Sequence, residues 1–188
     1  MEIQDVITRL EEGNARFVAD KLDGKLQNSE RRNSLTGGQD PYAIVLSCAD
    51  SRVVPELAFD SGLGEIFVIR VAGNVANTSS IASIEYAVAH IGTPVIIVLG
   101  HQSCGAVTAA ISGGDNGHNL NHLLAHITPA LNAVEEGASV NDVVKVNAKL
   151  TAQELVGRSE IIKNAVVAGK LKIVPAYYNL DSGKVDMM

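Results

Sequence analysis

The chain of 188 residues has no tryptophan, only two cysteines, no basic cluster longer than Arg31-Arg32 and no long apolar segment. Its formal net charge is -6. Because basic side chains must replace the counterions of phosphates, this charge argues against nucleic acid or an anionic membrane surface as a partner. The apolar runs are far shorter than the roughly 18 residues of a membrane-spanning helix. With 46% hydrophobic and 19% charged residues, the composition is that of a globular protein.

The amino terminus lacks the basic and apolar segments of a secretory signal. We therefore expect a reduced, cytoplasmic setting, with an organellar or exported origin as the alternative if a targeting peptide has been removed. The two cysteines, Cys48 and Cys104, could instead form one disulfide, and such a pairing would leave no metal ligands.

The length suits a single domain over residues 1–188, with an N-terminal helix and arm over 1–40 and an α/β core over 41–188. Apolar residues recur at helical spacing from Ile3 to Val18, which predicts an amphipathic helix. Its apolar stripe packs either on another subunit or on its own domain. The slight apolar excess of the whole chain favours an oligomer.

Nearly continuous apolar runs alternate with segments of helical periodicity in the remainder of the chain. This order is typical of a mostly parallel central β-sheet flanked by helices. The fold class that we expect is therefore α/β, with a protruding N-terminal helical arm. The strands are expected at 42–47, 66–71, 95–99 and 171–178 with an edge segment at 185, and the helices at 79–91, 105–113, 120–134 and 139–167.

Two of the apolar runs end in residues that bind soft metals. Cys48 follows the first run, and His101 and Cys104 follow the third. Because ligands of parallel sheets bind beyond the carboxyl ends of the strands, we expect these side chains to converge. A Cys2His set with a water in the fourth position is one of the ligand sets of catalytic zinc. The sequence thus predicts one Zn²⁺ per chain. A lone buried cysteine is more often packing, and a purely structural zinc normally has four protein ligands.

A charged couple, Asp50 and Arg52, follows the first cysteine. The Asp50 carboxylate is placed to accept a proton or hydrogen bond from a water on the metal, or to occupy the fourth metal position itself. The guanidinium of Arg52 has a planar fork that can hold this carboxylate off the metal. This competition predicts an activity that rises with pH.

The segments Cys48-Ala-Asp50-Ser-Arg52 and His101-Gln-Ser-Cys104-Gly105 together resemble the β-class carbonic anhydrases. The resemblance extends over nearly the whole chain. It includes Asn14-x-x-Phe17, Gly64-Glu65-x-Phe67, Arg70, Ser83-Ile-Glu85-Tyr86-Ala87 and the region from Gly169 to Gly183. It implies reversible hydration of carbon dioxide to bicarbonate and a proton, with zinc-bound hydroxide as the nucleophile. It also implies a homodimer or tetramer with the active site at the dimer interface.

By this resemblance, Cys48, His101 and Cys104 match the zinc ligands, and Asp50 with Arg52 matches the gating pair. The substrate-pocket positions of the plant-like members match three further residues, some of which reach in from the neighbouring subunit. These are Gln39, Phe67 and Tyr86. The glycine that follows the last ligand, Gly105, matches a position where a backbone N–H or a close approach serves the substrate.

The subtype is indicated by two departures from part of the family. Members inhibited by bicarbonate at a second site carry a tryptophan three residues before the first cysteine and a glycine just before it. This chain has Val45 and Ser47 there. We therefore expect the plant-like type, in which a water rather than Asp50 is the fourth zinc ligand near neutral pH. The alternatives are a hydrolase of carbon disulfide or carbonyl sulfide on the same scaffold, and a non-catalytic zinc-binding homologue.

Overall fold

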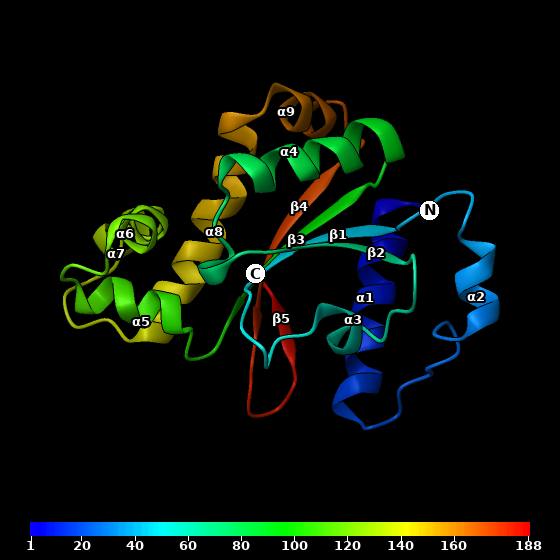
Figure 1. Ribbon diagram of the computed structural model, residues 1–188, viewed down its shortest axis with the longest axis horizontal. Coiled ribbons are helices and arrows are strands. Elements are labelled where there is room, and N and C mark those ends of the chain that lie inside the picture. Colours follow the sequence, from blue (N-terminus) through cyan, green and yellow to red (C-terminus); the bar gives the residue numbers. More distant parts are fainter.

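The apolar runs form a five-stranded sheet in the computed structural model, which describes residues 1–188 (Figure 1). Its strand order is β2-β1-β3-β4-β5, and all neighbours are parallel except β4 and β5. The sequence predicts this mostly parallel sheet correctly. The strands are β1 (Ala43–Ser47), β2 (Ile66–Arg70), β3 (Val95–His101), β4 (Lys172–Tyr178) and β5 (Val185–Met187).

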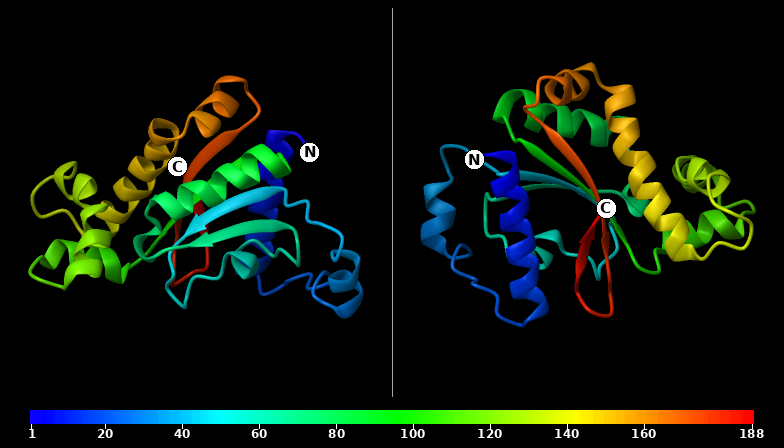
Figure 2. Two further views of the ribbon diagram at one scale, coloured as in Figure 1. Left: turned by 45° about the horizontal axis from the view of Figure 1, so that its top comes forward. Right: turned by 180° about the vertical axis from the view of Figure 1, so that it is seen from behind.

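Helices cover both faces of the sheet, as Figure 2 shows, with α1 on one side and α4 and α8 on the other. The α-helices are α1 (Ile3–Val18), α2 (Ser29–Ser34), α3 (Pro55–Ala58), α4 (Thr78–Tyr86), α5 (Gly105–Ser112), α6 (His118–Ala125), α7 (Thr128–Asn132), α8 (Val140–Arg158) and α9 (Glu160–Val167). Two short turns complete the set, the 3₁₀ turn η1 (Ala72–Asn74) and the π turn η2 (Ala87–Ile91) that continues α4.

The alternation of side chains along the strands divides the core into two layers. Val45 and Ile97 pack towards α1 and α3, while Leu46 and Val98 pack towards α4, α8 and α9. All four side chains are fully buried, and each such burial stabilises the fold by roughly 1.5–3 kcal/mol. Both faces of β1 and β3 are therefore buried, and the candidate site residues follow at the carboxyl ends of these strands.

Two predicted helices are broken in the structure. The segment expected at 120–134 ends at Ala125 and restarts at Thr128 as α7, because Pro129 in its first turn has no N–H to continue the earlier ladder. The region expected at 139–167 divides at Ser159, whose side chain accepts a hydrogen bond from the N–H of Ile162 and so caps α9. The third strand reaches His101, two residues beyond its predicted end, so that this ligand lies on the strand itself.

The N-terminal segment protrudes only in its second half. Val6 and Leu10 of α1 are fully buried against the sheet of their own chain, and α2 contributes no buried residue. Of the two surfaces that the sequence left open for the apolar stripe of α1, the structure shows its own domain, because Val6 and Leu10 pack on the sheet. None of the helices combines the length and the apolar character that a bilayer crossing needs.

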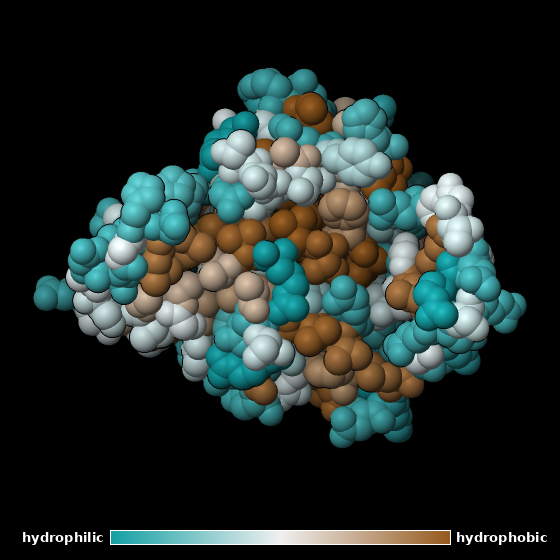
Figure 3. All heavy atoms as spheres, viewed as in Figure 1, coloured by the Kyte–Doolittle hydropathy of each residue, from teal (hydrophilic) through white to brown (hydrophobic).

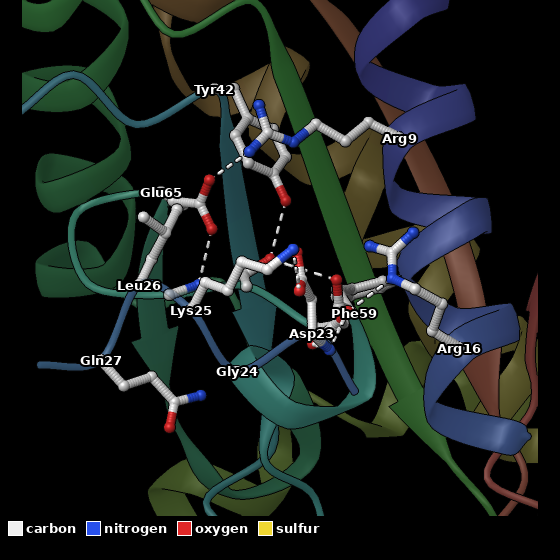
Figure 4. Close-up of a pocket in the computed structure, with 13 residues that line it drawn as sticks. Arg9, Arg16, Asp23, Gly24, Lys25, Leu26, Gln27, Tyr42, Phe59 and Glu65 are labelled. Atoms are coloured by element: carbon white, nitrogen blue, oxygen red, sulfur yellow. Dashed lines mark hydrogen bonds and ion pairs between the residues drawn. The ribbon is translucent and has the colours of Figure 1, made fainter. Parts of the chain in front are cut away.

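Ion pairs fasten α1 and the segment after it around a small polar cavity of about 100 Å³ (Figure 4). Arg9 pairs with Glu65, and Arg16 donates from Nε to Asp60 at 2.5 Å. The N–H of Asp23 also donates to the Asp60 carboxylate. Burial raises the pKa of the Asp60 carboxyl, but the bonds from Arg16 and from that N–H outweigh it and hold the pKa below its usual value. The charges lining this cavity thus serve to hold α1 on the core.

Candidate metal centre

The structure brings together the three predicted metal ligands. Cys48 follows β1, His101 ends β3, and Cys104 stands at the start of α5, and their ligand atoms all lie within 4.8 Å of one another. All three side chains are buried. The two sulfurs are 4.0 Å apart, close to the ~3.8 Å that tetrahedral coordination at zinc–sulfur distances requires. Both cysteines are free thiols, so the predicted alternative of a disulfide is not present.

The histidine ring presents a free lone pair to this cluster. Its Nδ1 lies 2.9 Å from the carbonyl oxygen of Gln102, and because a carbonyl can only accept, Nδ1 carries the hydrogen. In the neutral ring Nε2 is then the unprotonated nitrogen, and it is buried without any hydrogen-bond partner. A buried acceptor without a partner costs free energy unless something binds it. Two thiols and one free imidazole nitrogen are a donor set that fits Zn²⁺.

The loop between the last two ligands is held from both sides. The side chain of Gln102 exchanges hydrogen bonds with Asp181, in the turn between β4 and β5. The N–H of Ser103 donates to Oδ1 of Asn141 at 2.9 Å, and Ser103 has a positive φ of 53°. These contacts fix a backbone conformation that non-glycine residues rarely adopt, and so hold His101 and Cys104 in place.

Cys48 receives two backbone hydrogen bonds on its sulfur. The N–H of Asp50 donates from 3.4 Å and the N–H of Gly73 from 3.3 Å. The side chain of Arg70 holds the backbone of the same loop, since its guanidinium donates to the carbonyl oxygens of Cys48 and Asp50. The chain thus supplies fixed donors for a negatively charged sulfur at this position.

The two sulfurs lie within hydrogen-bond distance of each other, and this contact affects both thiols in opposite directions. The hydrogen bond with Cys104 is the main cause that lowers the pKa of the Cys48 thiol, while the bond with Cys48 and burial raise the pKa of the Cys104 thiol. A bound dication would displace the thiol protons, because cysteine binds metals as the thiolate.

Asp50 is held by Arg52 at the edge of the cluster. Arg52 donates from Nε to Oδ1 at 2.9 Å and from Nη2 to Oδ2 at 2.7 Å, and its backbone N–H also reaches Oδ1 at 3.0 Å. These bonds hold the pKa of the Asp50 carboxyl well below its usual range. Oδ2 nonetheless lies only 3.8 Å from Nε2 of His101. The carboxylate is therefore beside the ligand cluster while it is bonded to the guanidinium.

The predicted substrate-pocket residues are not all near this cluster. Gln39 is exposed and lies before β1, whereas Cys48 lies after it. The five residues of β1, about 17 Å long, stand between them. Phe67 and Tyr86 contact each other, with ring centroids 6.5 Å apart, on the side of the sheet where β2 forms the edge. Gly105 directly follows Cys104, is exposed, and a Cβ at this position would meet nothing within 4 Å.

Some of the contacts around the ligand cluster come from residues that carry no signal in the sequence. Asn141 and Asn147, both on α8, and Asp181 carry no metal-binding pattern, and Gly73 acts through its backbone.

Comparison with known proteins assigns the family. The chain matches the family model for carbonic anhydrase over residues 43–185. It is 41% identical over 184 residues to a carbonic anhydrase of Mycolicibacterium smegmatis, which covers 95% of this chain and 89% of that protein. The β-carbonic anhydrase of Coccomyxa, in complex with acetazolamide, has a TM-score of 0.78 and 26% identity over 97% of this chain and 86% of the other.

One of the tetrameric β-carbonic anhydrases of Sordaria macrospora has the same fold, with a TM-score of 0.76 and 23% identity over 98% of this chain and 97% of the other. The family model and the relatives define an enzyme, a carbonic anhydrase. Together with the fold and the Cys-His-Cys cluster, they show that the chain belongs to the β-class carbonic anhydrases.

Proposed function

We propose that this protein catalyses the reversible hydration of carbon dioxide to bicarbonate and a proton, with one zinc ion held by Cys48, His101 and Cys104. The observation that carries the proposal is the convergence of two buried sulfurs and the free Nε2 lone pair of His101. When bound there, zinc supplies Lewis acidity that ionises a water molecule near neutral pH. We assign this chemistry to a single domain over residues 1–188. We also propose that the enzyme is of the plant-like subtype and acts in the cytoplasm.

We propose that Asp50 accepts the hydrogen bond of the water molecule that is to be ionised. Its carboxylate, ionised at neutral pH and fixed by Arg52, accepts a hydrogen bond from the solvent molecule beside the ligand cluster. Arg52 keeps both carboxylate oxygens occupied, so that Asp50 stays off the metal. We place the small linear substrate near Gly105, which is exposed, carries no side chain and directly follows the ligand Cys104.

A second copy of the chain is proposed to complete the substrate pocket. β2 is an edge strand whose residues Ile66, Phe67 and Val68 are only partly buried. Figure 3 shows apolar side chains gathered over this region, between α4 and α3. An exposed apolar edge strand is a site of pairing with another chain. A homodimer across β2, or a tetramer of two such dimers, would cover this surface and bring the partner's Gln39 position and aromatic side chains towards the ligands.

The proposed function is tested by stopped-flow measurement of hydration with the zinc-loaded protein across pH. We expect carbon dioxide hydration that rises with pH, and no comparable turnover of carbon disulfide or carbonyl sulfide. Asp50→Ala is expected to lower the rate about 10²-fold or more while zinc is retained. A zinc-loaded protein that turns over only the sulfur substrates would instead support the alternative hydrolase, and one inactive on all three would support the non-catalytic homologue.

A further inference from the structure

Asn147 is a buried polar residue with no role in the proposed hydration reaction. It lies on α8 and is 2% exposed, among the apolar side chains that pack this helix on the sheet. Its Nδ2 donates to the carbonyl oxygen of Gly73 at 2.9 Å, a contact that joins residues 74 positions apart in the sequence. A polar side chain is costly in such a position unless its hydrogen bonds are made.

Gly73 connects this contact to the ligand cluster. The residue lies in η1, after the end of β2, and its N–H donates to Sγ of Cys48 at 3.3 Å. Its φ of 70° is in the left-handed region, and a Cβ there would meet Cδ1 of Ile127 at 2.9 Å. Glycine alone can adopt this turn without strain, and a turn built on glycine has little intrinsic preference for one orientation. Within the turn, the N–H of Asn74 donates to the carbonyl oxygen of Val71 at 2.8 Å, and the bond from Asn147 adds a restraint from outside the turn on the same peptide.

We infer that Asn147 is a positioning residue for the metal centre, which acts by fixing Gly73 so that its N–H remains bonded to the Cys48 thiolate. The inference rests on the proposed zinc site. A hydrogen bond to a thiolate ligand withdraws charge from the sulfur and fixes its direction. Contacts of this kind behind metal ligands are typically worth 10- to 100-fold in metal affinity.

The contact from Asn147 is separate from the other contacts that hold Cys48. Arg70 bonds the carbonyl oxygens of residues 48 and 50, and the second donor to the sulfur comes from the N–H of Asp50 in the same loop. Neither of these reaches Gly73. We therefore expect loss of the amide of Asn147 to weaken the bond from Gly73 to the sulfur and to leave the bond from Asp50 in place.

The experiment compares Asn147→Leu with the parent protein. Leucine has nearly the same volume and cannot donate. Thr151→Val is the matched control, because Thr151 lies one turn further along α8, is 3% exposed and, unlike Asn147, does not donate to Gly73. Zinc affinity is measured by competition with a chromophoric chelator. The sulfur-to-cobalt charge-transfer band is measured on the cobalt-substituted protein, and the free energy of unfolding is measured for each variant.

We expect Asn147→Leu to bind zinc about 10- to 100-fold more weakly than the parent and to shift the cobalt band to longer wavelength. Thr151→Val should keep both values while it loses some stability. Zinc affinity within twofold of the parent together with an unshifted band would overturn the inference. If Asn147→Leu does not fold, Asn147→Ser, whose hydroxyl is too short to reach Gly73, is compared in the same way.

These measurements separate the inference from the proposed function. They read metal binding and the sulfur environment, so they give the same answer whether or not the loaded protein hydrates carbon dioxide. A parent protein that binds no zinc would overturn both.

Discussion

Asn14 carries more of the stability of this fold than its position near the amino terminus suggests. From the buried side of α1, its Nδ2 donates to the carbonyl oxygens of Ala58 and Gly183, each at 2.9 Å, and its Oδ1 accepts from the N–H of Val185 at 2.8 Å. One side chain thus joins α1 to the end of α3 and to the β4–β5 hairpin. The turn of that hairpin contains Asp181, which contacts the loop between the metal ligands.

The substitution Asn14→Leu removes all three hydrogen bonds and leaves their backbone partners unpaired. Each such bond contributes about 1 kcal/mol net, so the expected loss in the free energy of unfolding is about 3 kcal/mol. For a chain of this size, 1 kcal/mol corresponds to about 2–4 °C in the melting temperature. The expected decrease in Tm is therefore about 6–12 °C.

Thermal unfolding of the zinc-loaded protein measures this effect. The protein concentration and zinc content must be equal in all samples, because oligomerisation and metal binding both shift Tm. Asn33→Leu is the control, since Asn33 is exposed on α2 and its side chain makes no hydrogen bond. A decrease for Asn14→Leu no larger than that of the control would refute the assignment of these three bonds.

Three other perturbations test separate parts of the structure. Arg52→Ala releases Asp50 to compete with solvent for the metal, so carbon dioxide hydration should fall most at neutral pH and recover as pH rises; an unchanged pH profile would contradict the gating role. Asp60→Asn should lower stability at pH 7 and flatten the acid unfolding curve, because the pKa of Asp60 is lowered in the folded state and its contribution, present above about pH 4, is lost as pH falls further. If circular dichroism shows that Asp60→Asn and the parent protein unfold equally steeply as pH falls, this role of Asp60 is wrong. Val68→Lys on the β2 edge should reduce the assembly to monomers in sedimentation experiments, whereas Val167→Lys on exposed α9 should not.

The ligand cluster was accessible to sequence reasoning because the apolar runs themselves mark the strand ends. Cys48 and His101 stand where β1 and β3 end, and a parallel sheet brings such ends to one edge. The spacing from His101 to Cys104 then adds the third ligand. Asp50 and Arg52 follow directly, because partners two positions apart in the sequence can meet through the local backbone.

Other features depend on tertiary contacts that no local pattern contains. The stripe of α1 predicts a buried face but does not specify which surface buries it, and Val6 and Leu10 turn out to pack on their own sheet. The bond from Asn147 to Gly73 joins distant segments through a backbone carbonyl, which has the same chemistry at every residue. The break at Ser159 depends on a side-chain cap at a residue type that also occurs within helices.

The relation between zinc and carbon dioxide hydration tests the central claim most directly. Zinc is removed with a chelator and restored in steps, and the hydration rate is measured by stopped flow above neutral pH at each zinc content. The account predicts a rate that is lost with the metal and returns in proportion to zinc, up to one ion per chain. A rate that stays at the buffer value when each chain holds one zinc ion would contradict the assignment of Cys48, His101 and Cys104 as a catalytic centre.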